Sequence, residues 1–284
     1  MFKFSLKFYL NITSRIELKE EMEVFRSYQI KPIGKLGEGA FGYVEKIELY
    51  NSDGNFCGLF SRKILRPKQN IIDNISLEEI KRRFTREVIY QSHCNDKNVT
   101  SIYLFNKYAE NPYFVMELAE SSLDTEIQNK SLNDEAKINI FMMMLKGVKV
   151  VHDKGYLHRD IKPQNILKFT KGIYKISDFG LVKNTDNGSN TTALTAIGQA
   201  MGTQKYMAPE ILYNAEYSKQ TDIFALGKVM EDLGVENKKC QLIIKKCCSM
   251  DKKQRHEEIG EILSELYDVG FRINTVLRRE ECLA

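Results

Sequence analysis

Short runs of apolar residues dominate the first part of the chain, and they have the length and composition of β-strands. Five such runs occur, at residues 28–36, 43–50, 57–65, 102–108 and 113–118. The clearest is YVEKIELY, residues 43–50, in which apolar and polar side chains alternate with a period of two. The turn sequence Asn51-Ser-Asp-Gly54 separates this run from the next. The pattern predicts an antiparallel meander.

Helical spacing appears once within this strand-rich part and then throughout the rest of the chain. Ser76-Leu-Glu-Glu79 fits a capping box, in which the hydroxyl and the glutamate each satisfy a free amide at a helix start. Apolar residues then recur at helical spacing, at Leu77, Ile80, Phe84 and Val88. After Glu120, residues 134–152 and 222–233 are apolar almost all round, which is typical of buried helices.

This change of pattern predicts an α+β protein of two lobes, with a ligand expected in the cleft between them. The small lobe is an antiparallel β lobe with one helix, and the larger lobe is mainly helical. The expected divisions are an N-terminal extension (1–27), a small lobe (28–116), a hinge (117–122), a large lobe (123–268) and a C-terminal tail (269–284). We found no internal repeat.

Composition narrows the class of protein. The 284 residues are 43% hydrophobic, which excludes a disordered chain, and the net charge of +4 is too small to indicate a nucleic-acid partner. No apolar run approaches the roughly 18–20 residues that span a bilayer. The six cysteines form no C-x-x-C pair, so we interpret them as reduced thiols of a cytoplasmic or nuclear protein.

Three groups of residues carry candidate chemistry. Residues 37–42 read G-E-G-A-F-G and precede a strand, so they lie in a strand–turn–strand and not at the helix start that a dinucleotide fold requires. Glycines there let the backbone approach phosphates without a side-chain clash. Lys63, in a strand with apolar flanks, is costly to bury unless it is paired or meets an anion. Glu87, on an inward helix stripe, offers it a partner.

The sharpest signal is the segment HRDIKPQN, residues 158–165, followed by KISDFGL, residues 175–181. The first places a carboxylate, a lysine and an amide (Asp160, Lys162 and Asn165) in one short loop. The second places Asp178 just after a strand, where a carboxylate can hold Mg²⁺.

These motifs together resemble those of a eukaryotic-type protein kinase, from about Tyr28 to Tyr267. The resemblance extends to Met207-Ala-Pro-Glu210, to the D-x-x-x-x-G pattern at Asp222 and Gly227, and to a late arginine, Arg255, that pairs with Glu210. It implies transfer of the γ-phosphoryl group of ATP to protein hydroxyls. The lysine of the catalytic loop and the segment GTQKYMAPE (202–210) are similar to those of Ser/Thr kinases and not of Tyr kinases.

The resemblance also assigns roles to residues. Asp160 would be the base that orients the substrate hydroxyl, Lys162 would screen the moving phosphoryl group, and Asn165 and Asp178 would hold Mg²⁺. The residues expected to bind ATP are Leu36, Gly37, Gly39, Gly42, Val44, Ser61, Lys63, Glu87, Met116, Glu117, Ala119 and Leu167. Arg159 would attract a phosphate on the activation segment, for which Thr195 is the first candidate and Thr192 and Thr191 are the next.

Two departures from the family pattern leave alternatives open. Gln91, one turn after Glu87, replaces an apolar residue, and only a short segment joins Gly227 to Arg255, where the family has another helix. Such an enzyme could require phosphorylation or a regulatory partner. A pseudokinase that acts as a nucleotide-binding scaffold is the alternative hypothesis, and a small-molecule phosphotransferase is a third that does not explain residues 202–210.

Overall fold

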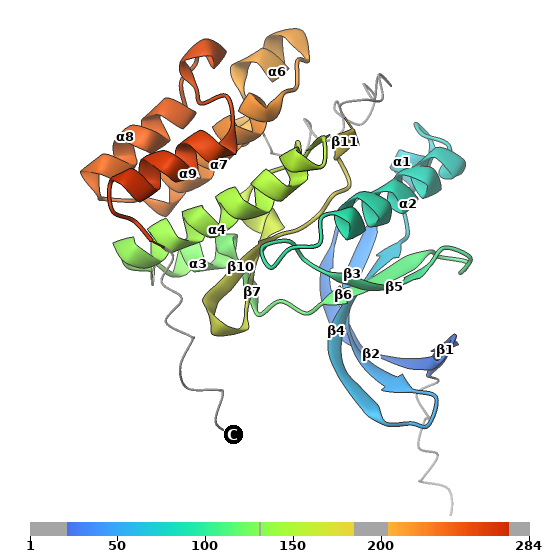
Figure 1. Ribbon diagram of the computed structural model, residues 1–284. Helices are drawn as coiled ribbons and strands as arrows, with labels where there is room; N and C mark the ends of the chain where they lie inside the picture. Colours follow the sequence, from blue (N-terminus) through green and yellow to red (C-terminus); the bar gives the residue numbers. More distant parts are fainter. Residues whose placement is uncertain (1–21, 131, 185–203, 273–284) are drawn as a thin grey trace, which may run out of the picture.

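The computed structural model describes residues 22–130, 132–184 and 204–272 (Figure 1). Its small lobe is built on an antiparallel 6-stranded sheet with the strand order β1-β2-β3-β4-β6-β5. The strands are β1 (Glu23–Phe25), β2 (Tyr28–Glu38), β3 (Gly42–Asn51), β4 (Phe56–Leu65), β5 (Ile102–Asn106) and β6 (Tyr113–Glu117). The five strands expected from the sequence are therefore confirmed.

One strand of the sheet was not expected. β1 pairs with β2 through Glu23 and Ile30, in a region that the sequence pattern placed in the N-terminal extension. A strand of three residues is too short to show a period, so its pattern carries no signal. An ion pair from Glu23 to Arg62 of β4 ties this edge to the sheet.

The helices of the small lobe are α1 (Gln69–Ile72) and α2 (Leu77–His93). α2 begins where the capping pattern predicted, and the Ser76 hydroxyl accepts a hydrogen bond of 3.3 Å from the Glu79 amide. The Glu79 carboxylate was expected to accept the second hydrogen bond of the capping box. It pairs instead with Arg82 and Arg83 on the next turn. Two arginines at close range offer a carboxylate stronger partners than one amide.

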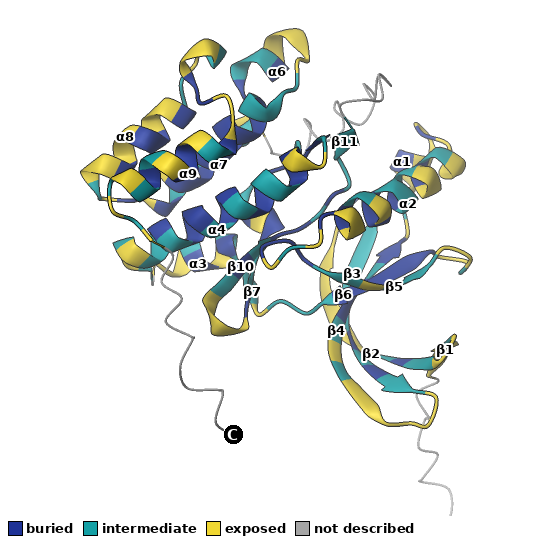
Figure 2. Cartoon of the chain, in the orientation of Figure 1, coloured by how far each residue is buried: buried dark blue, intermediate teal, exposed yellow. Residues whose placement is uncertain are grey.

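The large lobe is mainly helical, as the sequence predicted. Its elements are β7 (Ser121–Ser122), α3 (Leu123–Asn129), α4 (Asp134–Asp153), β8 (Tyr156–Leu157), η1 (Pro163–Asn165), β9 (Ile166–Phe169), η2 (Thr170–Gly172), β10 (Ile173–Ile176), β11 (Lys183–Asn184), η3 (Gln204–Tyr206), α6 (Pro209–Asn214), α7 (Lys219–Leu233), α8 (Lys238–Cys247), η4 (Lys252–Gln254) and α9 (Ile259–Asp268). Figure 2 shows α4 and α7 with buried residues along most of their length.

Apolar burial on α4 and α7 forms the main core. The fully buried side chains there include Phe141, Met142, Leu145, Ile223 and Leu226. Burial of such side chains stabilises a fold by about 1.5–3 kcal/mol each. This core includes Ile161 within the catalytic loop and Ile166 directly after it, so the loop rests on rigid packing.

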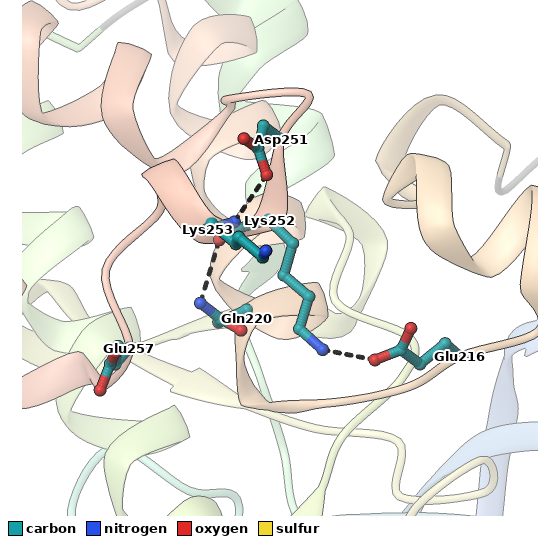
Figure 3. A pocket seen from close by; sticks show the side chains of 6 residues that line it. All are labelled: Glu216, Gln220, Asp251, Lys252, Lys253 and Glu257. Carbon is teal, nitrogen blue, oxygen red and sulfur yellow. Dashed lines mark hydrogen bonds and ion pairs between the residues drawn. The ribbon is translucent and has the colours of Figure 1, made fainter.

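A buried ion pair connects α6 with the segment that follows η4 in the large lobe. Arg255, just after η4, donates two hydrogen bonds to Glu210 of α6, at 2.7 and 2.9 Å. Next to it lies a polar pocket of about 450 Å³ (Figure 3). It is lined by Glu216, Gln220, Asp251, Lys252, Lys253 and Glu257, and none of these is a predicted site residue. Only residues 234–237 join α7 to α8, so this part of the lobe is as compact as the sequence indicated.

Candidate active site

Lys63 joins the two lobes. Its Nζ atom lies 2.5 Å from Oε1 of Glu87 on α2 and 3.0 Å from Oδ1 of Asp178 in the large lobe. The lysine side chain is 23% exposed and that of Glu87 is 5% exposed, so water screens their attraction only weakly. The structure thus brings together three residues that the sequence separates by up to 115 positions.

Local structure explains why these side chains meet. On β4, Lys63 lies opposite Val44 of β3 and Phe114 of β6, in the interior of the sheet. On α2, the buried residues Ile80, Phe84 and Val88 face the sheet and turn Glu87 toward Lys63. The spacing of apolar residues on the helix and their alternation on the strand therefore direct the side chains of Glu87 and Lys63 toward each other.

A short segment before β5 connects α2 to the strand that leads to Asp178. The amides of Thr100 and Ile176 donate hydrogen bonds of 2.9 and 2.8 Å, to Ile176 O and Asn98 O respectively. Gln91 of α2 donates from Nε2 to Thr100 O at 2.8 Å. The side-chain amide of Gln91, which departs from the family pattern, is therefore bonded at Nε2. Its Oε1 atom is buried and has no hydrogen-bond partner among the described residues. Through these bonds Gln91 connects the helix of Glu87 with β10.

Burial and charge shift the pKa values of the two carboxylates in opposite directions. Burial, with the negative charge of Asp178, raises the pKa of Glu87 to about 7 although Lys63 acts in the opposite sense. Burial alone would also raise the pKa of Asp178, but Lys63 and Lys162 hold it below its ordinary value. Asp178 is therefore the ionised carboxylate of the pair, as a metal ligand must be.

This shift predicts how stability depends on pH. The pKa of Glu87 is raised from its ordinary 4.5 to about 7 in the folded protein. At pH values between these two, Glu87 is protonated in the folded protein and ionised in the unfolded chain, so unfolding releases a proton. The free energy of unfolding should fall as the pH rises through this window, by at most about 3 kcal/mol. Urea unfolding between pH 5 and 7 should show this decline in the wild type and a flatter profile in Glu87→Gln. Parallel profiles would contradict the shift.

The catalytic-loop residues form a compact hydrogen-bonded group. Lys162 Nζ lies 2.8 Å from Oδ2 of Asp160, and Asn165 Nδ2 donates to the same oxygen at 2.8 Å. Asn165 Nδ2 also donates to the backbone oxygen of Asp160 at 2.8 Å. The Asp160 carboxylate is thus held in one orientation, which is what a residue that positions a reacting hydroxyl requires.

The backbone of this site is strained. Arg159 has a φ of 70° and Asp178 a φ of 63°. Both lie in the left-handed region of backbone conformation, which residues other than glycine rarely adopt. Buried Asp222 of α7 stabilises the first of these turns, because its carboxylate accepts hydrogen bonds from the amides of His158 and Arg159 at 2.8 and 2.9 Å. His152 of α4 contacts the same carboxylate at 2.8 Å.

The sequence did not reveal this supporting role. Asp222 was recognised only as part of a resemblance, and His152 was not selected at all. A signal existed, because a lone aspartate within an apolar helix must find buried hydrogen-bond donors. The donors themselves, two backbone amides of a distant loop, could not be identified from residue types.

The oxygen atoms that remain free match the chemistry of magnesium. The Oδ1 atom of Asn165 and the Oδ2 atom of Asp178 make no hydrogen bond among the described residues, and both side chains belong to the same site. Mg²⁺ prefers oxygen ligands and is usually held by one or two protein groups together with phosphates and water. Accordingly, residues 22–130, 132–184 and 204–272 contain no cluster of three or more side chains suited to hold a metal alone.

The glycine turn between β2 and β3 is closed by a hydrogen bond of 2.8 Å from the Gly39 amide to Gly42 O. Gly42 has a φ of 155°, and a Cβ atom there would lie 1.9 Å from the backbone oxygen of Ile64. At Gly37 a Cβ atom would meet nothing within 4 Å. At Gly39 a Cβ atom would make only an ordinary contact, 4.0 Å from Gly42 O, so Gly42 alone of the three glycines is required by the fold itself.

This difference gives a prediction for two matched variants. Gly42→Ala should lower the free energy of unfolding by roughly 1–3 kcal/mol, because the backbone must shift to admit the methyl group. Gly37→Ala should change it by less than about 1 kcal/mol. Thermal unfolding of both variants measures the difference, and equal midpoints would show that the turn adopts another conformation in solution.

The remaining expected ATP-binding residues lie along the junction of the lobes. Buried Ser61 of β4 faces Met116 of β6, and half-buried Leu167 lies on β9 opposite Ser122 of β7. Leu36 is the exception, because it lies at the exposed end of β2 with 53% of its surface exposed.

The backbone of residues 117–119 can offer a hydrogen-bond donor to a base. The Glu117 amide donates to Ser101 O at 3.2 Å, and its carboxylate binds the Ser101 amide and Lys175. The amide of Ala119 makes no hydrogen bond among the described residues. Of Glu117 and Ala119, it is therefore Ala119 whose backbone amide is free to donate a hydrogen bond to a base.

The candidate phosphorylation sites cannot be placed in the same way. Thr191, Thr192 and Thr195 lie outside the described residues. Arg159, which is expected to attract a phosphate on that segment, is described, and its guanidinium group lies 3.9 Å from the centre of the Tyr217 ring.

Comparison with known proteins agrees with this geometry. Residues 30–241 match the family model of the protein kinase domain. Three relatives are a probable serine/threonine-protein kinase of Clostridium perfringens (33% identity; 55% of this chain and 22% of the relative), an Aurora kinase of Eremothecium gossypii (32%; 71% and 52%) and human serine/threonine-protein kinase Nek5 (29%; 87% and 35%). The chain spans at most about half the length of these relatives. With most of its residues matched by the family model, the chain belongs to the protein kinase family.

Proposed function

We propose that this chain is an active serine/threonine protein kinase that transfers the γ-phosphoryl group of ATP to protein hydroxyls. One observation carries the proposal, namely the contact of Lys63 Nζ with both Glu87 and Asp178. This arrangement places a cation and a metal-ligating carboxylate side by side at the junction of the lobes. The names of the relatives, which are serine/threonine kinases of bacteria and eukaryotes, support the same activity.

The residues of the large lobe would act on the acceptor hydroxyl. Asp160 is 7% exposed, and its Oδ2 atom accepts hydrogen bonds from both Lys162 and Asn165. Its Oδ1 atom can therefore accept a hydrogen bond from the hydroxyl and take its proton. Lys162 Nζ would remain beside the reacting oxygen and stabilise negative charge there. Orientation and charge of this kind account for most of the rate enhancement in phosphoryl transfer.

The residues of the small lobe would hold the triphosphate. Lys63 supplies a positive charge for the α- and β-phosphates, and the open space at Gly37 leaves room for them beside the turn. Mg²⁺, when bound, supplies further positive charge to the phosphate oxygens. Asn165 and Asp178 would hold it through the oxygens that are free in the described residues.

Regulation and location are separate proposals. A phosphate on Thr195, Thr192 or Thr191 would form charge-assisted bonds with Arg159 and order the activation segment. Mass spectrometry after incubation with ATP tests this, and the absence of phosphate at all three threonines would overturn it.

The five described cysteines are free thiols, which supports a cytoplasmic or nuclear location. Among the described residues, no helix has the length and apolarity needed to cross a bilayer.

A scaffold that binds nucleotide without transfer is the competing hypothesis. The buried Oε1 atom of Gln91, which lacks a partner among the described residues, favours it by weakening the link between α2 and β10. Against it, Lys63, Glu87, Asp160, Asn165 and Asp178 are all present. Lys63 contacts Glu87 and Asp178, and Asn165 contacts Asp160.

Transfer of label from γ-labelled ATP to a generic basic protein distinguishes the two. The wild type should label the substrate, and Lys63→Met and Asp178→Asn should each reduce the rate by at least roughly 10²-fold. Labelling of equal strength by all three proteins would mean that a contaminant is responsible, and the kinase proposal would fail.

A further inference from the structure

α8 presents a row of lysines to solvent. One side of the helix packs on α7 and α9 through Cys240, Ile243, Ile244 and Cys247, which are all buried. The opposite side is exposed at Lys238, Lys239, Gln241, Leu242, Lys245 and Lys246. We call these six residues the α8 face. Figure 1 shows α8 at the outer side of the large lobe, away from the small lobe.

The charges on the α8 face are largely uncompensated. Lys246 pairs with Glu265 of α9 at 2.7 Å. In the part of the chain that the structure describes, Lys238, Lys239 and Lys245 form no ion pair. Leu242 lies between them, one helical turn from each pair of lysines, and 70% of its surface is exposed.

Two of these lysines are in positions that disfavour a positive charge. Lys238 and Lys239 are the first two residues of α8 after its N-cap, Asn237, and the first turn contains no acidic residue. The positive end of the helix dipole repels cations at this point. The Asp134 carboxylate of α4 accepts hydrogen bonds from the amides of Glu236 and Asn237 at 2.7 and 2.8 Å, which compensates part of this positive charge. No ion pair of the described residues holds Lys238 or Lys239 in place.

We propose that the α8 face is a docking site for an acidic segment of a partner protein that places an apolar side chain on Leu242. Acidic side chains would pair with Lys238, Lys239 and Lys245, and the helix dipole would favour the same negative charge. The proposal goes beyond phosphoryl transfer and does not depend on it, since Lys63 and Asp160 are on other elements.

Other anionic surfaces fit this face less well. Leu242 is its only apolar side chain, and the rest of the apolar side of α8 is buried, so the helix cannot insert into a bilayer as amphipathic surface helices do. The face also has no arginine and no aromatic residue, which are the groups that stack on nucleic-acid bases. A protein segment that combines acidic and apolar side chains matches both features.

Fluorescence anisotropy with a labelled peptide of Asp and Glu around a central Leu tests the docking site. The wild-type chain should bind this probe, and Lys238→Glu with Lys239→Glu should weaken binding at least about tenfold. Leu242→Ala should weaken it as well. The matched control reverses two exposed lysines elsewhere, Lys97→Glu with Lys107→Glu, and should bind the probe as the wild type does. Lys63→Met should also bind it normally, which separates docking from catalysis.

Thermal unfolding provides a second readout for the same variant. Lys238→Glu with Lys239→Glu should raise the midpoint by about 2–4 °C, since acidic residues suit the first turn of a helix. A variant that is more stable and yet loses binding cannot owe the loss to misfolding. Equal affinity in the two charge-reversed pairs, or no binding of the probe by the wild type, would overturn the proposal. So would binding only of single-stranded DNA or of phosphatidylserine vesicles through this face.

Discussion

Asp160→Asn should reduce the rate of phosphoryl transfer by roughly 10²–10³-fold while leaving the affinity for ATP nearly unchanged. The amide keeps the shape of the side chain and its contacts with Lys162 and Asn165, but it cannot accept the proton of the substrate hydroxyl. Because Lys63 and Asp178 remain in place, the nucleotide is still held. The loss should therefore appear in kcat and not in the KM for ATP.

Steady-state kinetics with a protein substrate measure this effect, and Gln164→Ala is a suitable control. Gln164 is part of the same loop, but its side chain points away and binds Asp124 of α3 at 2.8 Å. Its substitution should change kcat by less than about tenfold. A full rate for Asp160→Asn would remove Asp160 from the mechanism, and an equal loss in both variants would indicate general damage to the loop.

Arg255→Met should destabilise the protein by about 3–5 kcal/mol, the usual cost of breaking a buried ion pair from one side. The Arg255 side chain is 0% exposed and that of Glu210 is 10% exposed. Besides Glu210, the guanidinium group binds the backbone oxygens of Ser249 and Gln220 at 2.7 and 3.2 Å. It also lies 4.9 Å from the centre of the Phe224 ring. Its removal leaves the Glu210 carboxylate and the carbonyl groups of Ser249, Gln220 and Met250 without this donor.

Urea unfolding tests this expectation against a nearby exposed pair. Lys252 contacts Glu216 at the edge of the pocket in Figure 3, and both side chains are partly exposed. Lys252→Ala should cost only about 0–1 kcal/mol, as is typical of surface ion pairs. If the two substitutions were equally mild, Arg255 would not fasten the lobe, and the apolar core alone would have to account for its stability.

The sequence was sufficient to predict the elements that have a long and regular pattern. The alternation in residues 43–50 identified β3, and the almost wholly apolar residues 134–152 identified α4. β1 was missed because three residues show no period, and its position depends on pairing with β2 and on Arg62. Patterns of this kind reveal burial, whereas short edge strands are decided by their partners.

For the site, the sequence identified which residues matter but not all of the reasons. Lys63 and Glu87 could be paired because each is costly to bury alone. The left-handed backbone at Asp178 and the two amides held by Asp222 depend on contacts between distant segments, which residue types do not reveal. Gln91 was identified only as a departure from the family pattern, and its bond to Thr100 O depends on a backbone group whose position only the fold determines.

The most direct test of the proposed nucleotide site is a crystal structure of the protein with Mg²⁺ and a non-hydrolysable ATP analogue. We expect the triphosphate to lie against Lys63 and the metal to be bound by Asn165 Oδ1 and Asp178. We also expect the base to accept a hydrogen bond from the amide of Ala119. A nucleotide bound elsewhere, or none at the junction of the lobes under saturating conditions, would contradict the proposed mechanism.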